Sequence, residues 1–247
     1  MRRTNREIEI LCFELYRSQF SVPPGDVHYA DKPDVVIEGA RCIGFEIASL
    51  YLEHGTNPAS EQVQQSRREA ALKRAQAAHV AAGRKNFELH VAFAAKHPII
   101  NVKAVSAALV SIASRIVDDQ PSGFLMRNEF KGTPEIADVY LNPKLYPDSH
   151  WRTSQVFTVP NLAVPMVRDI VAQKDRLLFN YAPCDEYRLL LVVDFMDSAQ
   201  DQDLRWPDGE PPVETAFSEV VIFKPQVHER LFVPVMHPSG SVRSATA

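Results

Sequence analysis

The clearest structural pattern in the chain lies in Lys32-Pro33-Asp34-Val35-Val36-Ile37-Glu38-Gly39-Ala40-Arg41-Cys42-Ile43-Gly44-Phe45-Glu46-Ile47-Ala48. Strand-forming residues occur in two runs, 35–37 and 42–47, and Gly39 in the connection can adopt a positive φ. This pattern predicts an antiparallel hairpin. Because a hairpin returns the chain to its starting edge, Asp34 before the first strand and Glu46 near the end of the second are expected to meet. Two convergent carboxylates make a suitable site for Mg²⁺.

An amphipathic helix is predicted before the hairpin, at residues 5–19. Its apolar residues recur at helical spacing and form one face: Ile8, Leu11, Cys12 and Leu15. Acidic residues flank this face, among them Glu7 and Glu9. Taken by itself, each of these acids is a solvated side chain on a helix surface.

After the hairpin, the sequence predicts a helix at residues 61–82 and a strand at residues 86–94. Seven alanines give the helix a high propensity and a flat face for packing on a sheet, and Gly83 is a common helix stop. Apolar and polar residues alternate along 86–94, which is typical of a strand with one buried face. No Gly-rich phosphate loop occurs, so a Rossmann or P-loop domain is excluded.

The second half of the chain predicts further elements of both kinds. Residues 102–117 and 164–181 have the spacing of amphipathic helices. Strands are expected at residues 136–141, 155–159, 188–194, 220–223 and 231–235. The fold class is therefore α/β, with a three-layer core in which a mixed sheet lies between helices.

We expect one domain over residues 1–240, followed by a disordered tail at 241–247. A core at residues 1–117 and additional strands and a helix at 118–240 make up this domain. The length of 247 residues allows it, and the apolar fraction of 45% and the charged fraction of 23% are those of a soluble globular protein.

The net charge of −4 argues against a protein that coats nucleic acid through its overall charge, so any such binding needs a local basic patch. Cys12, Cys42 and Cys184 are too few and too widely spaced for a disulfide framework or a zinc site. No apolar run is long enough to span a membrane, and the N-terminus carries acids where a signal peptide is apolar. We therefore expect a cytoplasmic protein without a membrane partner, and a homodimer remains open.

In the hairpin, Pro33-Asp34 and Glu46-Ile47 resemble the motif of the PD-(D/E)XK nuclease superfamily, which has the restriction-endonuclease-like fold. The motif continues with a lysine, where this chain has Ala48, and residues 43–48 look like a group of bacterial members with a small residue there. Residues 174–193 also resemble the late helix and strand of those bacterial proteins. The resemblance implies a three-layer restriction-endonuclease-like core and metal-dependent hydrolysis of phosphodiester bonds in nucleic acid.

The resemblance also implies a cofactor and a set of site residues. Asp34, Glu46 and the backbone carbonyl of Ile47 would hold Mg²⁺ or Mn²⁺. Side chains from the flanking helices would support the site: Glu7 or Glu9 from the first helix, and Gln62, Gln65 or Lys73 from the second. Ala48 cannot supply the charge of the motif lysine, and losing one such electrostatic donor typically costs about 10²–10³ in rate. The site is then slow, rescued by Lys73, or inactive.

The helix at residues 61–82 carries the one local basic excess of an acidic chain. Between residues 61 and 85 there are six basic residues against two acids. The expected nucleic-acid-binding residues are Arg67, Arg68, Lys73 and Arg74. The plainer interpretation of each is a solvated helix residue. Two alternatives to an active nuclease remain: a nuclease-fold protein that only binds nucleic acid or a protein, and an unrelated α/β protein in which Asp34 caps a strand and Glu46 pairs with a surface base.

Overall fold

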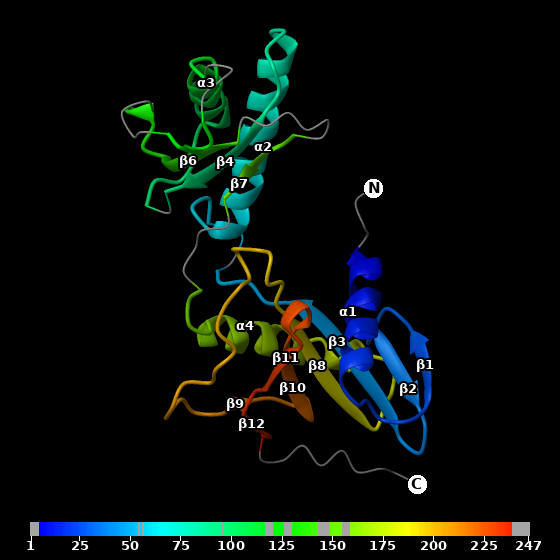
Figure 1. Cartoon of the computed structure of the whole chain (residues 1–247). Coiled ribbons are helices and arrows are strands. Elements are labelled where there is room, and N and C mark those ends of the chain that lie inside the picture. Colours follow the sequence, from blue (N-terminus) through cyan, green and yellow to red (C-terminus); the bar gives the residue numbers. More distant parts are fainter. Residues whose placement is uncertain are drawn as a thin grey trace. The chain divides into compact units, whose positions relative to one another are not determined.

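The computed structural model describes residues 5–53, 55, 57–94, 96–116, 121–125, 130–142, 149–154 and 159–238. The chain forms two compact units, one made of residues 1–53 and 159–247 and the other of residues 54–158 (Figure 1). The second unit is therefore an insertion into the sequence of the first. A core at residues 1–117 was expected as one body, but the boundary at residue 53 divides it between the two units.

A six-stranded mixed sheet forms the centre of the first unit, in the order β1-β2-β3-β8-β10-β11. Its strands are β1 (Asp26–Tyr29), β2 (Val35–Glu38), β3 (Cys42–Ser49), β8 (Glu186–Val192), β10 (Glu219–Lys224) and β11 (Glu229–Phe232). The first three form an antiparallel meander, β3, β8 and β10 run parallel, and β11 is antiparallel to β10. The carboxyl ends of β3, β8 and β10 therefore lie at one edge of the sheet.

The predicted hairpin is β2–β3, and its register pairs Val35 with Phe45 and Glu38 with Cys42. The sequence suggested that glycine is needed at position 39 because the turn gives it a positive φ. This explanation is wrong, because Gly39 is not among the described residues with positive φ. A Cβ at Gly39 would instead lie 2.3 Å from the carbonyl oxygen of Pro24, so glycine is required by the close approach of another backbone segment.

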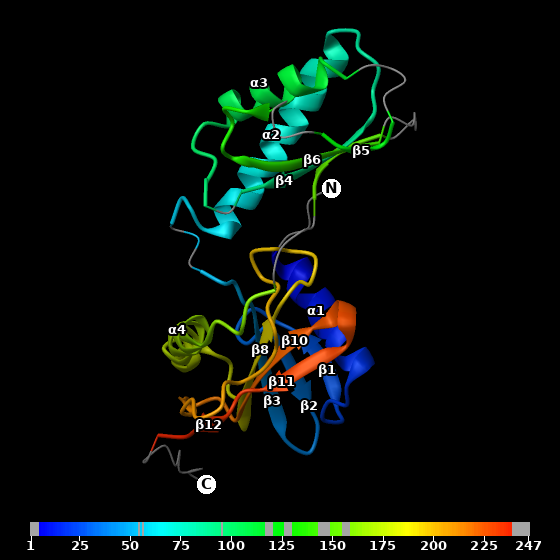
Figure 2. The same ribbon diagram turned by 60° about the vertical axis from the view of Figure 1, so that its left-hand side comes forward.

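Two helices cover opposite faces of this sheet (Figure 2). Phe13 and Tyr16 of α1 (Asn5–Gln19) pack on the face that carries Ile37 and Phe45. On the other face, α4 (Val164–Asp175) packs through a second apolar cluster. The expected arrangement of a mixed sheet between helices is thus present. The predicted helix at 164–181 ends earlier, at Asp175, and a short 3₁₀ turn, η2 (Leu178–Asn180), follows it.

The second unit has its own four-stranded sheet, in the order β5-β6-β4-β7. Its elements are α2 (Glu61–Ala81), β4 (Glu88–Phe93), α3 (Val102–Ala113), β5 (Gly123–Phe124), β6 (Ile136–Asn142) and β7 (Trp151–Thr153). Ala71 and Ala75 of α2 are fully buried against α3 and the sheet, as the alanine-rich sequence predicts. Gly83 has φ 70° just after the end of α2, which agrees with its predicted role as a helix stop.

The remaining described elements are a short two-stranded sheet, β9 (Val213–Glu214) with β12 (Val235–Met236), and the 3₁₀ turn η3 (Pro225–Val227). The strand expected at 155–159 and the tail expected at 241–247 lie outside the described residues, apart from Val159, which is not in a strand. Among the described residues, no helix is both long and apolar enough to cross a bilayer.

Candidate active site

The structure brings Asp34 and Glu46 together at one end of the β2–β3 hairpin. Asp34 directly precedes β2, and the pairing of Val35 with Phe45 places Asp34 opposite Glu46 one step further along. The Oδ2 atom of Asp34 accepts a hydrogen bond from the backbone N–H of Ile47, at 2.7 Å. Since the N–H and C=O of a strand residue point to the same side, the carbonyl of Ile47 also faces the Asp34 side. The three expected metal ligands are therefore neighbours.

The face of the sheet to which Glu46 points is set by the alternation along β3. Ile43, Phe45 and Ile47 pack on the α1 side. Ala48 packs against the apolar cluster on the α4 side. Glu46 is two residues from Ala48 and so shares its face, where it is only 6% exposed. The carboxylate of Glu46 consequently lies beneath the last turn of α4.

Lys174, in the last turn of α4, supplies a cation at this point. Its Nζ atom lies 2.5 Å from Oε1 of Glu46, and the lysine side chain is 25% exposed. Lys174 therefore presents its ammonium group on the face of the sheet where the strand itself carries Ala48. The site prediction did not include Lys174, although the resemblance over residues 174–193 begins at this residue and was the signal that could have found it.

Two further side chains, Glu9 and Tyr181, lie close enough to Glu46 for its charge to affect their pKa values. Burial raises the pKa of Glu9, on α1, and the nearby Glu46 raises it further while Lys174 opposes the rise. Glu7, the other expected acid of α1, is exposed. Glu9 is thus electrostatically coupled to the acidic pair.

Tyr181, just after η2, is the second such group. Its hydroxyl oxygen and Oε2 of Glu46 are both buried, and the two side chains lie next to each other. Burial raises the pKa of Tyr181, and the proximity of Glu46 raises it further. The backbone beside it is anchored, because the N–H of Ala182 donates to the carbonyl of Lys32 at 2.8 Å. Tyr181 is thus a fixed, protonated hydroxyl next to the acidic pair.

Burial raises the pKa of Asp34 to about 7, and the negative charge of Glu46 contributes to the rise. The hydrogen bond from Ile47 and the charge of Lys174 act in the opposite direction without offsetting it. Two carboxylates that repel each other at one end of the hairpin fit a divalent cation, because a cation would relieve that repulsion.

The donor set for such an ion is small. Within the described part of the chain, no group of three or more His, Cys, Asp or Glu side chains is arranged to hold a metal. The expected site has two carboxylates and a backbone carbonyl, a set that Mg²⁺ completes with water.

The three other predicted site residues lie on α2 and so belong to the second compact unit. Gln62 and Gln65 are half-buried there, and Lys73 is exposed. Asp34 and Glu46 belong to the first unit, which already provides a cation from Lys174. A role for Gln62, Gln65 or Lys73 at the acidic pair stays a prediction.

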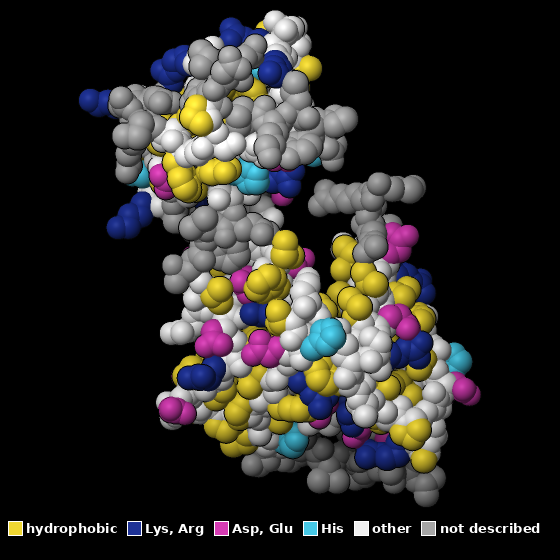
Figure 3. Space-filling view, viewed as in Figure 1, with side chains coloured by type: hydrophobic (Ala, Val, Ile, Leu, Met, Phe, Trp, Pro, Cys, Tyr) yellow, Lys and Arg dark blue, Asp and Glu magenta, His cyan; other side chains and the backbone are white. Residues whose placement is uncertain are grey.

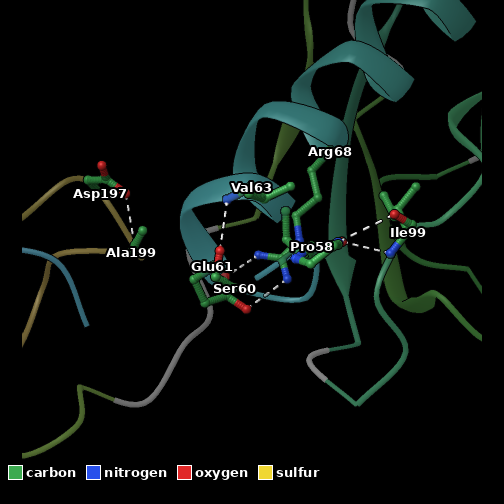
Figure 4. Close-up of polar contacts among 9 residues, drawn as sticks. Pro58, Ser60, Glu61, Val63, Arg68, Ile99, Asp197 and Ala199 are labelled. Carbon is green, nitrogen blue, oxygen red and sulfur yellow. Dashed lines mark hydrogen bonds and ion pairs between the residues drawn. The ribbon is translucent and has the colours of Figure 1, made fainter. Parts of the chain in front are cut away.

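The basic residues of α2 divide into two structural classes. Arg68 is buried and makes two hydrogen bonds to Glu61, at 2.6 and 2.9 Å, and Arg67 donates to the carbonyl of Ile99 at 2.7 Å (Figure 4 shows Arg68 and Glu61). These two guanidinium groups hold the start of α2 in place. Lys73 and Arg74 are exposed. Of the four predicted nucleic-acid-binding residues, these two are the ones open to a ligand.

Charge is distributed unequally between the units. Residues 54–158 contain 13 Lys and Arg against nine Asp and Glu, whereas the other residues contain 14 against 22. The second unit therefore carries a net charge of about +4 and the first about −8, with His neutral. Dark blue Lys and Arg side chains are visible over the second unit in Figure 3.

Comparison of the chain with protein-family models, with curated proteins and with solved structures finds no match in any of the three.

Proposed function

We propose that the first unit is a metal-dependent phosphodiester hydrolase that acts on nucleic acid. The observation that carries this proposal is the convergence of Asp34 and Glu46 at adjacent strand ends, with Lys174 2.5 Å from Glu46. Metal-dependent hydrolysis of a phosphodiester needs ligands for a hard cation, and fixed positive charge near the phosphoryl oxygens favours it. The carboxylates of Asp34 and Glu46 and the ammonium group of Lys174 are chemical groups that meet these requirements.

The proposed fold of this unit is a restriction-endonuclease-like core made of α1, the β1–β2–β3 meander, α4 and β8. Two features support it. Both parts of the resemblance, at residues 33–48 and 174–193, fall in this unit and on neighbouring elements, because β8 pairs parallel with β3. The second unit then interrupts the core between β3 and α4 and accounts for the long separation of the two parts in the sequence.

Lys174 is proposed to replace the lysine that is missing at Ala48. Lysine acts in such a site as a point charge on a flexible stem, so its position on the chain matters less than the place that its ammonium group reaches. The contact with Glu46 shows where that group lies in the absence of substrate.

Asp34, Glu46 and the carbonyl of Ile47 are the proposed ligands of Mg²⁺ or Mn²⁺. Such an ion supplies Lewis acidity, which neutralises charge on a phosphoryl group and acidifies water in the site. Without it, Asp34 is the residue that holds a proton, since its pKa of about 7 lies far above the ordinary range of an aspartic acid. Glu9 and Tyr181 border the pair and would orient water or substrate by hydrogen bonding.

The second unit is proposed to contact the nucleic-acid backbone through its positive charge. The catalytic unit is acidic and cannot attract a polyanion by its net charge, whereas residues 54–158 have a cationic excess. Lys73 and Arg74 are the exposed members of the predicted binding set. Arg67 and Arg68 are assigned to the structure of α2 instead.

A cleavage assay tests the proposed activity. The protein is incubated with labelled single- and double-stranded DNA and RNA oligonucleotides in Mg²⁺, Mn²⁺ or EDTA. We expect cleavage that requires a divalent ion and that falls by at least about 100-fold in Glu46→Gln and in Asp34→Asn. Glu38→Gln is the matched control, because Glu38 lies at the opposite end of the same hairpin. Cleavage that survives in both site variants would assign it to another site or another protein.

A second candidate function is that of a nuclease-fold protein that binds nucleic acid or a partner without cleaving. The same contacts favour this function, because both carboxylates already have partners within the protein. Lys174 neutralises Glu46, and Asp34 accepts a hydrogen bond from the N–H of Ile47. Titration calorimetry with Mn²⁺ separates the two. Binding to the wild type that disappears in Glu46→Gln supports the hydrolase, and equal heats for wild type and variant support the binding protein.

A further inference from the structure

Two of the three cysteines meet in the fold, although they are far apart in the sequence. Cys42 is the first residue of β3, and Cys184 lies two residues before β8. Their Sγ atoms are 2.6 Å apart, and both thiols are free. The sequence alone predicted no pairing, because 142 positions separate the two residues.

The backbone around both cysteines is fixed by hydrogen bonds. The N–H of Cys42 donates to the carboxylate of Asp185 at 2.7 Å, and the N–H of Asp185 donates to the carbonyl of Cys42 at 2.9 Å. The N–H of Cys184 donates to the hydroxyl of Tyr187 at 3.0 Å. The parallel pairing of β3 with β8 starts at the next residue, Ile43. A bond between the two sulfurs, about 2.05 Å long, therefore needs little movement of the chain.

Both thiols are also partly exposed, so a dissolved oxidant can reach them. Burial raises the pKa of Cys184 to about 12, with the neighbouring thiol of Cys42 and the charge of Asp185 adding to the rise. A raised pKa makes the thiolate scarce at neutral pH and slows thiol–disulfide exchange without preventing it. Cys12, also partly exposed, is not within bonding distance of another thiol among the described residues.

We propose that Cys42 and Cys184 are a redox-active dithiol that closes to an intramolecular disulfide when a low-molecular-weight disulfide such as oxidised glutathione is present. One thiolate attacks the oxidant and releases glutathione thiolate. The second cysteine then displaces the other glutathione from the mixed disulfide. The protein thiols lose two electrons and two protons, and oxidised glutathione gains them to become two molecules of reduced glutathione.

The disulfide would join β3, which carries Glu46, to the segment between α4 and β8. It would also close a loop that contains the whole second unit, since residues 54–158 lie between the two cysteines. A covalent link across so long a loop stabilises the folded chain mainly by restricting the unfolded one. The oxidised protein should therefore unfold at a temperature about 5–10 °C higher than the reduced protein.

The test counts free thiols in the full-length protein. The protein is incubated with oxidised glutathione at pH 8.5, unfolded, labelled with N-ethylmaleimide and weighed by mass spectrometry. Reduced wild type should take up three labels and oxidised wild type one, because three cysteines are present. Cys12→Ser is the matched control and should fall from two labels to none on oxidation. Cys42→Ser cannot close the disulfide, so any label that it loses should be replaced by a glutathione adduct at Cys184 and never by an intramolecular crosslink.

Peptide mapping of the oxidised wild type makes the result independent of how the variants fold. The proposal predicts a crosslinked peptide that contains both Cys42 and Cys184, and dithiothreitol should remove both the crosslink and the thermal shift. Three labels after oxidation, stable glutathione adducts in place of a crosslink, or a crosslink through Cys12 would each overturn it.

Discussion

Asp34 holds its proton more tightly than an ordinary aspartic acid because it is buried beside Glu46. A group whose pKa is raised by folding binds more protons in the folded state than in the unfolded state between the two pKa values. For Asp34 this interval runs from about pH 4, the ordinary value for aspartic acid, to about pH 7. Its contribution to stability is fully present below this interval and is lost as the pH rises through it.

A thermal-unfolding series in EDTA from pH 4 to pH 8 measures this loss. We expect Asp34→Asn to be more stable than the wild type at pH 7.5 and the difference to shrink towards pH 4, because the amide has no charge to desolvate. Mn²⁺ at pH 7.5 should raise the unfolding temperature of the wild type and leave that of Asp34→Asn unchanged. Parallel curves for the two proteins would mean that Asp34 does not titrate in this interval.

At the scale of single elements, α2 shows how two arginines that look alike in sequence acquire different roles. Arg68 faces inward, where its side chain is 10% exposed and contacts Glu61 through both guanidinium nitrogens of the fork. Arg74, six residues later, faces solvent. A buried cation must be paired, because its desolvation is otherwise uncompensated.

Removal of the charge on Glu61 should therefore destabilise the second unit. We expect Glu61→Gln to lower the free energy of unfolding by about 1–3 kcal/mol, since it leaves the guanidinium of Arg68 buried without its counter-ion. Glu69→Gln on the same helix is the control, because Glu69 is exposed, and it should change the free energy by less than about 0.5 kcal/mol. Urea denaturation followed by circular dichroism measures both, and equal effects would show that the Glu61 pair is not special.

The site residues on the β2–β3 hairpin could be predicted from the sequence, whereas the site residue on α4 could not. Asp34 and Glu46 lie within thirteen positions of each other, and the turn between two strand-forming runs was enough to place them together. Lys174 is 128 positions from Glu46, and no local pattern connects them. The helix itself was predicted, but which residue of its last turn faces β3 is decided by packing on the sheet.

At the scale of the whole molecule, the helices and the longer strands could be predicted, but β1, at residues interpreted as a loop, and the short strands β5, β7, β9 and β12 could not. The division of the strands between sheets could not be predicted either. The strand at 86–94 has an alternating pattern that any half-buried sheet satisfies, and the structure places it as β4 in the second sheet. Arg67 and Arg68 were predicted to bind nucleic acid, but both form hydrogen bonds within the second unit, and the sequence could not show this for a related reason. Composition identifies a basic helix, whereas burial and partners decide which of its charges are free.

The unequal charge of the units leads to a prediction about binding. Lys73→Glu with Arg74→Glu should weaken binding of the protein to nucleic acid and reduce the slope of log K against log[salt] by about two, one for each lost phosphate contact. The same two changes should leave Mn²⁺ binding at the Asp34–Glu46 pair intact. Fluorescence anisotropy at several salt concentrations provides the measurement, with Lys103→Glu on α3 as the control. An unchanged slope would place the nucleic-acid interface elsewhere.

The central claim is that Lys174 supplies the charge that Ala48 cannot, in a hydrolytic site built on Asp34 and Glu46. Relocating the lysine tests it most directly, by comparing Mn²⁺-dependent cleavage rates of the wild type, Lys174→Met, Lys73→Met and the double variant Lys174→Met with Ala48→Lys. At saturating nucleic acid, where a weaker phosphate contact does not limit the rate, we predict a loss of about 10²–10³ in Lys174→Met, a rate close to that of the wild type in Lys73→Met, and partial recovery in the double variant. A Lys174→Met protein that cleaves as fast as the wild type would contradict the account.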